Sequence, residues 1–134
     1  MNLKHTLLSL TIASVAALSV APSAAQAGSL DNAALACYID TYAWDQLSSD
    51  YCGAAWTPGT SNVNSVAYFE VVGLAAGSYS YSWSGAACGN TYSCTTPIRA
   101  YPEQTKTLSV TVYNNSTGES KTVSATAEYI DGYH

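Results

Sequence analysis

Few residues of this chain could carry out acid-base or nucleophilic chemistry. The sequence contains two histidines, His5 and His134, and histidine is the side chain best suited to proton transfer near neutral pH. His5 lies in an apolar N-terminal segment that we expect to be removed, and His134 is the last residue. A nucleophile paired with histidine is therefore not expected. We predict no catalytic residues and no enzymatic activity.

Three carboxylates recur every five residues, at Asp40, Asp45 and Asp50. Paired carboxylates can hydrolyse glycosidic bonds, and carboxylate oxygens can bind Ca²⁺. A spacing of five aligns with neither a helix face nor a strand face. The segment also lacks the alternating Asp-x-Asp-x-Asp pattern of a calcium loop. We interpret these acids as solvated loop charges and predict neither a metal nor another cofactor.

Large aromatic side chains gather in the same segment, Thr41 to Thr60, which shows no sustained period. Exposed aromatic rings are surfaces on which sugar rings stack, so Trp44 and Trp56 are candidate ligand contacts in a carbohydrate site. The alternative is a small cluster buried beneath a long loop, the usual place for large aromatics. Both interpretations remain open from the sequence.

The four cysteines are Cys37, Cys52, Cys88 and Cys94. An even number in an exported chain indicates two disulfides, for which three pairings exist. We favour Cys37 with Cys52 and Cys88 with Cys94, because each couple is close in sequence with turn-forming residues between its members. Neither couple has the short gap of a zinc knuckle.

The N-terminus has the pattern of a cleavable signal peptide. An apolar run from Leu7 to Ala21 leads to Ala25-Gln26-Ala27, the small-x-small form that signal peptidase requires. The run is shorter than the roughly 20 apolar residues that span a bilayer. We predict a signal peptide over residues 1–27, cleavage after Ala27, a secreted or periplasmic protein without a membrane span, and one domain over residues 28–134.

The charge balance makes one class of partner improbable. Nine acids against four bases give the whole chain a formal net charge of −5. Nucleic-acid binding depends on clustered lysine and arginine that displace counterions, and the bases here are few and scattered. We expect no nucleic-acid partner, and the same deficit disfavours anionic membrane surfaces.

The remaining elements are short strands. From Ser78 to Ser84 the sequence alternates, with Tyr79, Tyr81 and Trp83 on the side that we predict to be buried. Similar alternation predicts strands over Leu35–Ile39, Val63–Val72, Thr95–Tyr101, Thr107–Tyr113 and Lys121–Tyr129. The strand with Pro97 should lie at an edge.

We predict a long ordered loop over Thr41–Thr60, with a helical turn near Trp44–Leu47, although segments of this length can also be misassigned strands. We expect Ile130–His134 to fray.

These strands predict an all-β fold, because three large aromatics on one strand face need an opposite sheet to cover them. The Tyr-x-Tyr-x-Trp strand, followed by Leu108-Ser-Val-Thr-Val and a closing Thr-Val-Ser-Ala-Thr-Ala hairpin, resembles the second half of bacterial immunoglobulin-like and PKD-like domains over about Val66 to Tyr129. The PKD turn after the tryptophan is absent, and so are the antibody-type cysteines near Phe69 and Val110. The resemblance implies a single antiparallel β-sandwich of immunoglobulin-like type.

For function, the resemblance implies adhesion, spacing or recognition rather than catalysis. Our first hypothesis is a non-catalytic exported binding or structural module whose partner is an unknown protein or glycan. Two alternatives remain: a carbohydrate-binding domain that uses Trp44 and Trp56, and a small secreted hydrolase inhibitor that presents the loop between Cys88 and Cys94.

Overall fold

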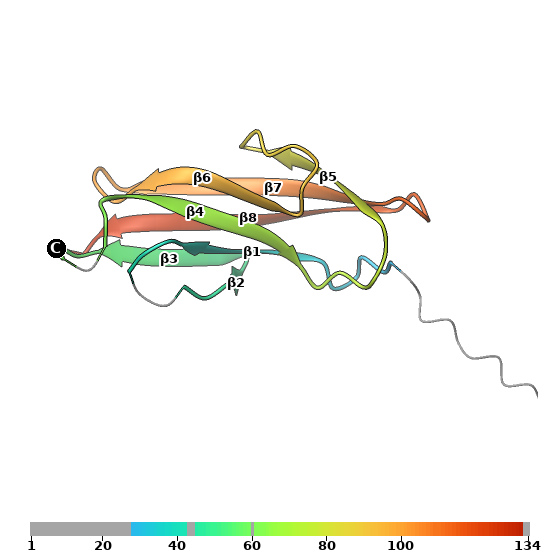
Figure 1. The fold of residues 1–134 in the computed structure, drawn as a ribbon, viewed down its shortest axis with the longest axis horizontal. Coiled ribbons are helices and arrows are strands. Elements are labelled where there is room, and N and C mark those ends of the chain that lie inside the picture. The colour runs from blue at the N-terminus through green and yellow to red at the C-terminus, as the bar shows by residue number, and fades with distance from the viewer. Residues whose placement is uncertain (1–27, 43–44, 60, 133–134) are drawn as a thin grey trace, which may run out of the picture.

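The computed structural model describes residues 28–42, 45–59 and 61–132, and within these ranges the protein is all-β (Figure 1). Its strands are β1 (Ala34–Ile39), β2 (Ser48–Ser49), β3 (Tyr51–Trp56), β4 (Asn64–Val72), β5 (Tyr79–Ser84), β6 (Ser93–Arg99), β7 (Gln104–Asn114) and β8 (Ser120–Asp131). The predicted signal peptide, residues 1–27, lies outside the described residues. No described segment forms a helix long and apolar enough to cross a membrane.

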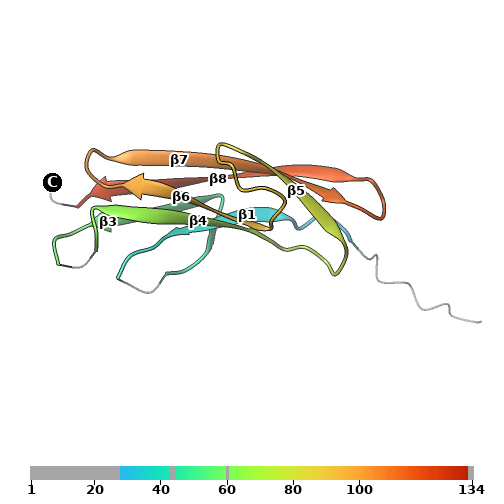
Figure 2. The same ribbon diagram turned by 45° about the horizontal axis from the view of Figure 1, so that its top comes forward.

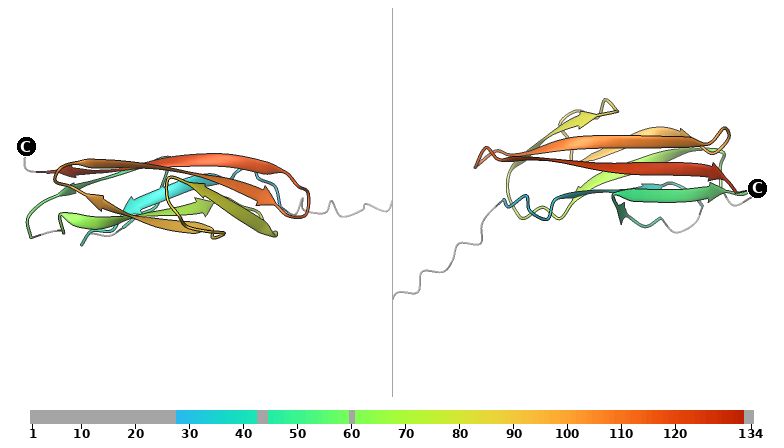
Figure 3. Two further views of the ribbon diagram at one scale, coloured as in Figure 1. Left: turned by 90° about the horizontal axis from the view of Figure 1, so that it is seen from above. Right: turned by 180° about the vertical axis from the view of Figure 1, so that it is seen from behind.

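The strands form two four-stranded sheets, which stack face to face (Figures 2 and 3). Sheet A has the order β2-β1-β4-β6, and sheet B has the order β3-β8-β7-β5. The prediction of an all-β protein with two sheets and two disulfides is confirmed. Pro97 lies in β6 at the edge of sheet A, as predicted, where its missing N–H breaks no ladder.

The core lies between the sheets and follows the period of two that the sequence predicts. Alternate residues of β4, β7 and β8 point inward and are buried: Ala67, Phe69, Val71, Leu108, Val110, Val112, Ala125, Ala127 and Tyr129. Burying a valine, leucine or phenylalanine side chain contributes about 1.5 to 3 kcal/mol each before the entropy of ordering is subtracted. The two sheets therefore stabilise each other mainly through these facing rows.

The first disulfide crosses from one sheet to the other. Cys37 of β1 is bonded to Cys52 of β3, their Cα atoms lie 5.7 Å apart, and 15 residues separate them. The second joins Cys88 to Cys94 of β6 across 6 residues. No free cysteine remains in the described ranges. On the chain-entropy model, loops of these lengths contribute roughly 3 and roughly 2 kcal/mol respectively.

The prediction of a long loop over Thr41–Thr60 is wrong, because this segment contains β2 and β3. β3 pairs in parallel with β8, from Tyr51 beside Thr126 to Trp56 beside Asp131, so the expected wholly antiparallel sandwich is also wrong. The strand was missed because Gly53, Ala54 and Ala55 give it no alternation of large apolar and polar residues. The predicted helical turn is not present at residues 45–47, and Trp44 lies outside the described residues.

Two smaller expectations also need correction. β8 continues through Asp131, so residues 130–131 do not fray; the backbone N–H of Gly132 still donates to the Trp56 carbonyl at 2.9 Å. Tyr79, Tyr81 and Trp83 pack against the core but are only half-buried. Their partial exposure follows from the position of β5 at the edge of sheet B, where β7 is its only neighbouring strand in the sheet.

Tyr129 supplies a test of the core. Its ring is fully buried, and its hydroxyl donates to the Asn62 carbonyl at 2.7 Å and lies 3.0 Å from Ser61 Oγ. We expect Tyr129→Phe to lower the free energy of unfolding by about 1 to 3 kcal/mol, because buried partners lose their hydrogen bond. Urea denaturation measures the change. The matched control is Tyr113→Phe, in an exposed ring of the same hairpin; an equal loss in both variants would contradict the interpretation.

Candidate functional site

The described residues contain no group of three or more histidine, cysteine or carboxylate side chains close enough to hold a metal ion. Every buried side-chain nitrogen and oxygen among them has a hydrogen-bond partner. Buried polar groups left without partners often mark reacting or ligand-binding positions. The interior of the described fold therefore shows no unpartnered polar side chain, and the polar and aromatic groups that could contact a ligand lie on its outer faces and sheet edges.

Of the two tryptophans predicted to contact a carbohydrate, Trp44 and Trp56, the structure describes only Trp56. Trp56 lies on β3, is half-buried against the core, and donates from Nε1 to the Ser61 carbonyl at 3.0 Å. Trp44 lies outside the described residues. With its indole N–H bonded internally and one face packed, Trp56 is mainly a structural residue.

A tyrosine pair on the outer face of sheet A was not predicted as a site. Tyr38 of β1 is the register partner of Tyr68 of β4, and their ring centroids lie 5.0 Å apart with an interplanar angle of 33°. Tyr68 donates to a Glu70 carboxylate oxygen at 2.7 Å. Desolvation of the ring, followed by the hydrogen bond to Glu70, raises the pKa of Tyr68 to about 12. Strand alternation places both tyrosines outward; only the register makes them neighbours.

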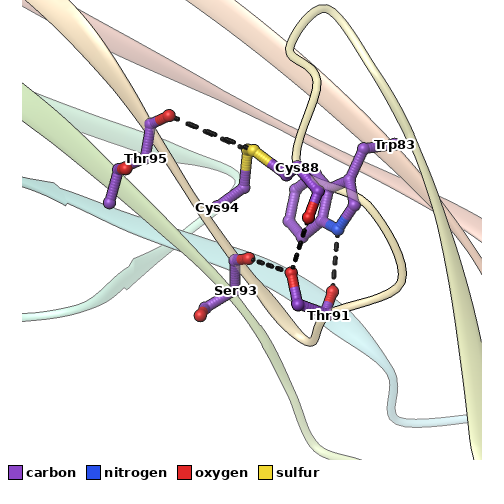
Figure 4. Close-up of a disulfide and its surroundings, with 6 residues drawn as sticks. All are labelled: Trp83, Cys88, Thr91, Ser93, Cys94 and Thr95. Atoms are coloured by element: carbon purple, nitrogen blue, oxygen red, sulfur yellow. Dashed lines mark hydrogen bonds between the residues drawn. A yellow bond between two sulfur atoms is a disulfide. The ribbon is translucent and has the colours of Figure 1, made fainter.

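The loop between Cys88 and Cys94 is folded against β5 and β6 (Figure 4). Trp83 Nε1 donates to the Thr91 carbonyl at 2.8 Å, and Thr91 Oγ1 donates to the carbonyls of Cys88 and Ser93 at 3.1 and 2.7 Å. Asn90 Oδ1 accepts the backbone N–H of Tyr81 at 2.7 Å. The loop therefore covers the free edge of β5 and uses its own polar groups to do so.

Rows of hydroxyl side chains cover the middle of the outer face of sheet B. Cross-strand pairs join β7 to β8: Thr107 with Thr126 at 2.9 Å, Ser109 with Ser124 at 2.7 Å, and Thr111 with Thr122 at 2.8 Å. Such pairs each contribute roughly 0.2 to 1 kcal/mol to an antiparallel ladder. The middle of this face is therefore polar and uncharged, and the Glu128 carboxylate lies beyond it toward the end of β8.

No family model, no curated protein and no solved structure matches this chain. The candidate surfaces are therefore defined by their own geometry.

The Tyr68 environment predicts a dependence of stability on alkaline pH. The pKa is near 10 in an unfolded chain and about 12 in the folded protein. Above about pH 10 the unfolded state loses this proton first, so the contribution of Tyr68 is present below that pH and is lost as the pH rises toward about 12. The free energy of unfolding in urea, measured from about pH 9 to about pH 11, should fall less steeply for Tyr68→Phe than for the wild type. Equal slopes would count against the assignment.

Proposed function

We propose that this protein is a non-catalytic binding or structural module of immunoglobulin-like type, exported to the periplasm or outside the cell. The strand order supports this. With the short β2 set aside, the order β1-β4-β6 is the one expected for immunoglobulin strands A, B and E, and the order β8-β7-β5 is the one expected for strands G, F and C. The disulfides suit an oxidising compartment.

Trp83 adds support, because it lies on β5, the strand in the place of C, and packs toward the core. Immunoglobulin domains carry a tryptophan on that strand. The inter-sheet disulfide differs: it joins β1 to β3 rather than the strands in the places of B and F. The covalent link between the two sheets lies between the N-terminal strands.

The observation that carries the proposal is the position of the functional groups in the described fold. The buried polar side chains of the described residues all have hydrogen-bond partners, and the described cysteines are bonded to each other. Exposed tyrosines such as Tyr51 and Tyr113, and the cross-strand hydroxyl pairs of β7 and β8, lie on the surface. A rigid frame with polar, partly aromatic faces suits recognition, because little ordering entropy remains to be lost on binding.

We expect the purified protein to hydrolyse no ester, glycoside, peptide or phosphate-ester substrate above the buffer rate. Reduction of both disulfides should lower its free energy of unfolding, by up to roughly 5 kcal/mol on the chain-entropy model. Urea denaturation with and without reductant measures the second effect. Turnover that co-purifies with the protein and is lost in a single-residue variant would contradict the proposal.

A carbohydrate ligand is a second candidate, and the Tyr38–Tyr68 pair favours it. The two rings lie side by side on an outer sheet face beside the Glu70 carboxylate, which can accept sugar hydroxyls. The inhibitor hypothesis has less support, since Asn90 and Thr91 of the stapled loop already bond to β5 and to the loop itself.

Retention on a panel of insoluble polysaccharides tests the carbohydrate candidate. We expect the double variant Tyr38→Ala and Tyr68→Ala to bind about tenfold more weakly or worse, because both aromatic faces are lost. Tyr113→Ala, which removes an exposed ring from sheet B, serves as the control. Unchanged retention of the double variant would exclude this surface.

A further inference from the structure

β3 is the free edge of sheet B, with β8 on its other side (Figure 3). The carbonyls of Asp50 and Trp56, at the two ends of this segment, accept from the backbone N–H groups of Thr126 in β8 and of Gly132 just after β8. Backbone N–H and C=O groups alternate in direction along a strand. In β3 the groups of the even-numbered residues therefore point toward β8, and those of the odd-numbered residues point away from β8 in the plane of the sheet. The N–H and C=O groups of Gly53 and Ala55 therefore point outward, and no described residue bonds to them.

The other edges carry features that oppose the addition of a strand. Asn90 occupies the Tyr81 N–H at the β5 edge, Pro97 removes a donor from β6, and β2 is only 2 residues long. Proteins usually protect free edges in these ways. β3 is a six-residue edge with no proline and no side chain bonded to its outward backbone groups among the described residues. Thr41, Gln46 and Ser48 of the preceding segment lie across a groove from it, and Gly53 and Ala55 are small enough to let another backbone approach.

An exposed aromatic ring and a carboxylate lie together on this edge. The Tyr51 side chain folds over Gly53, where an added Cβ would lie 2.9 Å from its hydroxyl oxygen. That hydroxyl donates to the Glu128 carboxylate at 2.6 Å, and this hydrogen bond raises the pKa of Tyr51. The Tyr51 ring is 51% exposed. An aromatic face beside a carboxylate is a suitable site for a lysine or arginine side chain.

The charges near the edge have one sign. Asp50 precedes β3, Glu128 is the register neighbour of Gly53, and Asp131 is that of Trp56. Asp45 lines a groove of about 520 Å³ along the same strand. The cations of the described ranges lie elsewhere: Arg99 on β6, Lys106 on β7 beside β6, and Lys121 bonded to the carbonyls of Leu30 and Asp31.

We propose that the β3 edge binds an extended, lysine- or arginine-bearing segment of another protein as an added strand of sheet B. The outward groups of Gly53 and Ala55 would form the new ladder, and a basic side chain opposite Gly53 would lie on the Tyr51 ring and reach Glu128. This mode is β-strand addition, in which backbone bonds give affinity and side chains give specificity. A second copy of this chain fits less well, because its own β3 edge would bring the same acids into contact. The inference rests on the proposed binding function.

Three synthetic peptides test the edge with the full chain. The first is an acetylated, amidated peptide of about eight residues that alternates lysine and valine, long enough to cover one edge strand. The second replaces lysine with glutamate. The third keeps lysine but carries N-methyl groups on every second residue, which block one hydrogen-bonding edge. We expect calorimetry to detect the first peptide, with affinity at least about tenfold above the other two, and hydrogen exchange to show protection of the Gly53 and Ala55 amides.

Substitutions in the protein test the same edge from the other side of the interaction. Ala55→Pro removes an outward donor without removing a bond to β8, so binding should weaken about fivefold or more while the fold is kept. Glu128→Gln should weaken lysine-peptide binding by about threefold to tenfold and reduce its dependence on salt. Glu119→Gln, in the turn between β7 and β8, is the control for net charge and should bind as the wild type does.

The outcomes separate the two proposals. Equal binding of the N-methylated peptide, or protection at residues away from β3, would overturn strand addition. A dimer in sedimentation analysis with concentration-dependent protection of Gly53 and Ala55 would also overturn it, since a second copy would then occupy the edge. If a polysaccharide or protein ligand binds and Ala55→Pro leaves that binding unchanged, the proposal of strand addition at β3 fails while the proposed binding function stands. Enzymatic turnover by the protein would instead contradict the proposed non-catalytic function.

Discussion

The whole structure depends on keeping two twisted sheets in contact over a thin core. The facing rows are built mostly from small and branched residues, such as Ala67, Val110 and Ala127, so the sheets can approach closely. The core also holds two large aromatic side chains: Tyr129 of β8 is fully buried and its hydroxyl is hydrogen-bonded, and Phe69 of β4 is fully buried on sheet A. The bond between Cys37 and Cys52 prevents the layers from separating at the side where the N-terminal strands lie.

Sequence reasoning succeeded where periodicity was strong. The strands around Phe69, Val110 and Ala125 alternate clearly, and the structure has a strand at each of these predicted places. It failed at β3, because Gly53 to Ala55 carry almost no side-chain signal and the strand is defined by its pairing with β8. Pairing between distant segments is a tertiary property, which propensity alone cannot supply. The tryptophan strand was identified correctly, but its edge position, and hence its partial burial, depends on strand order.

The same distinction applies to the surfaces. Alternation predicts that Tyr38 and Tyr68 point outward, but their contact follows from the register of β1 against β4. The capping of β5 by Asn90 follows from how the stapled loop folds back, which cysteine spacing does not determine. The edge of β3 is recognisable only after the other edges have been assigned. Single residues could therefore be listed from the sequence, whereas the groupings that make a surface required the fold.

The parallel pairing of β3 with β8 has a mechanical consequence. A pull on the N-terminal side of the fold passes from β1 through the Cys37–Cys52 bridge into β3, while a pull at the C-terminal side enters the far end of β8. The two strands are then drawn in opposite directions along their length, and the hydrogen bonds between them bear the load together instead of opening one at a time. A domain built in this way resists stretching along its chain.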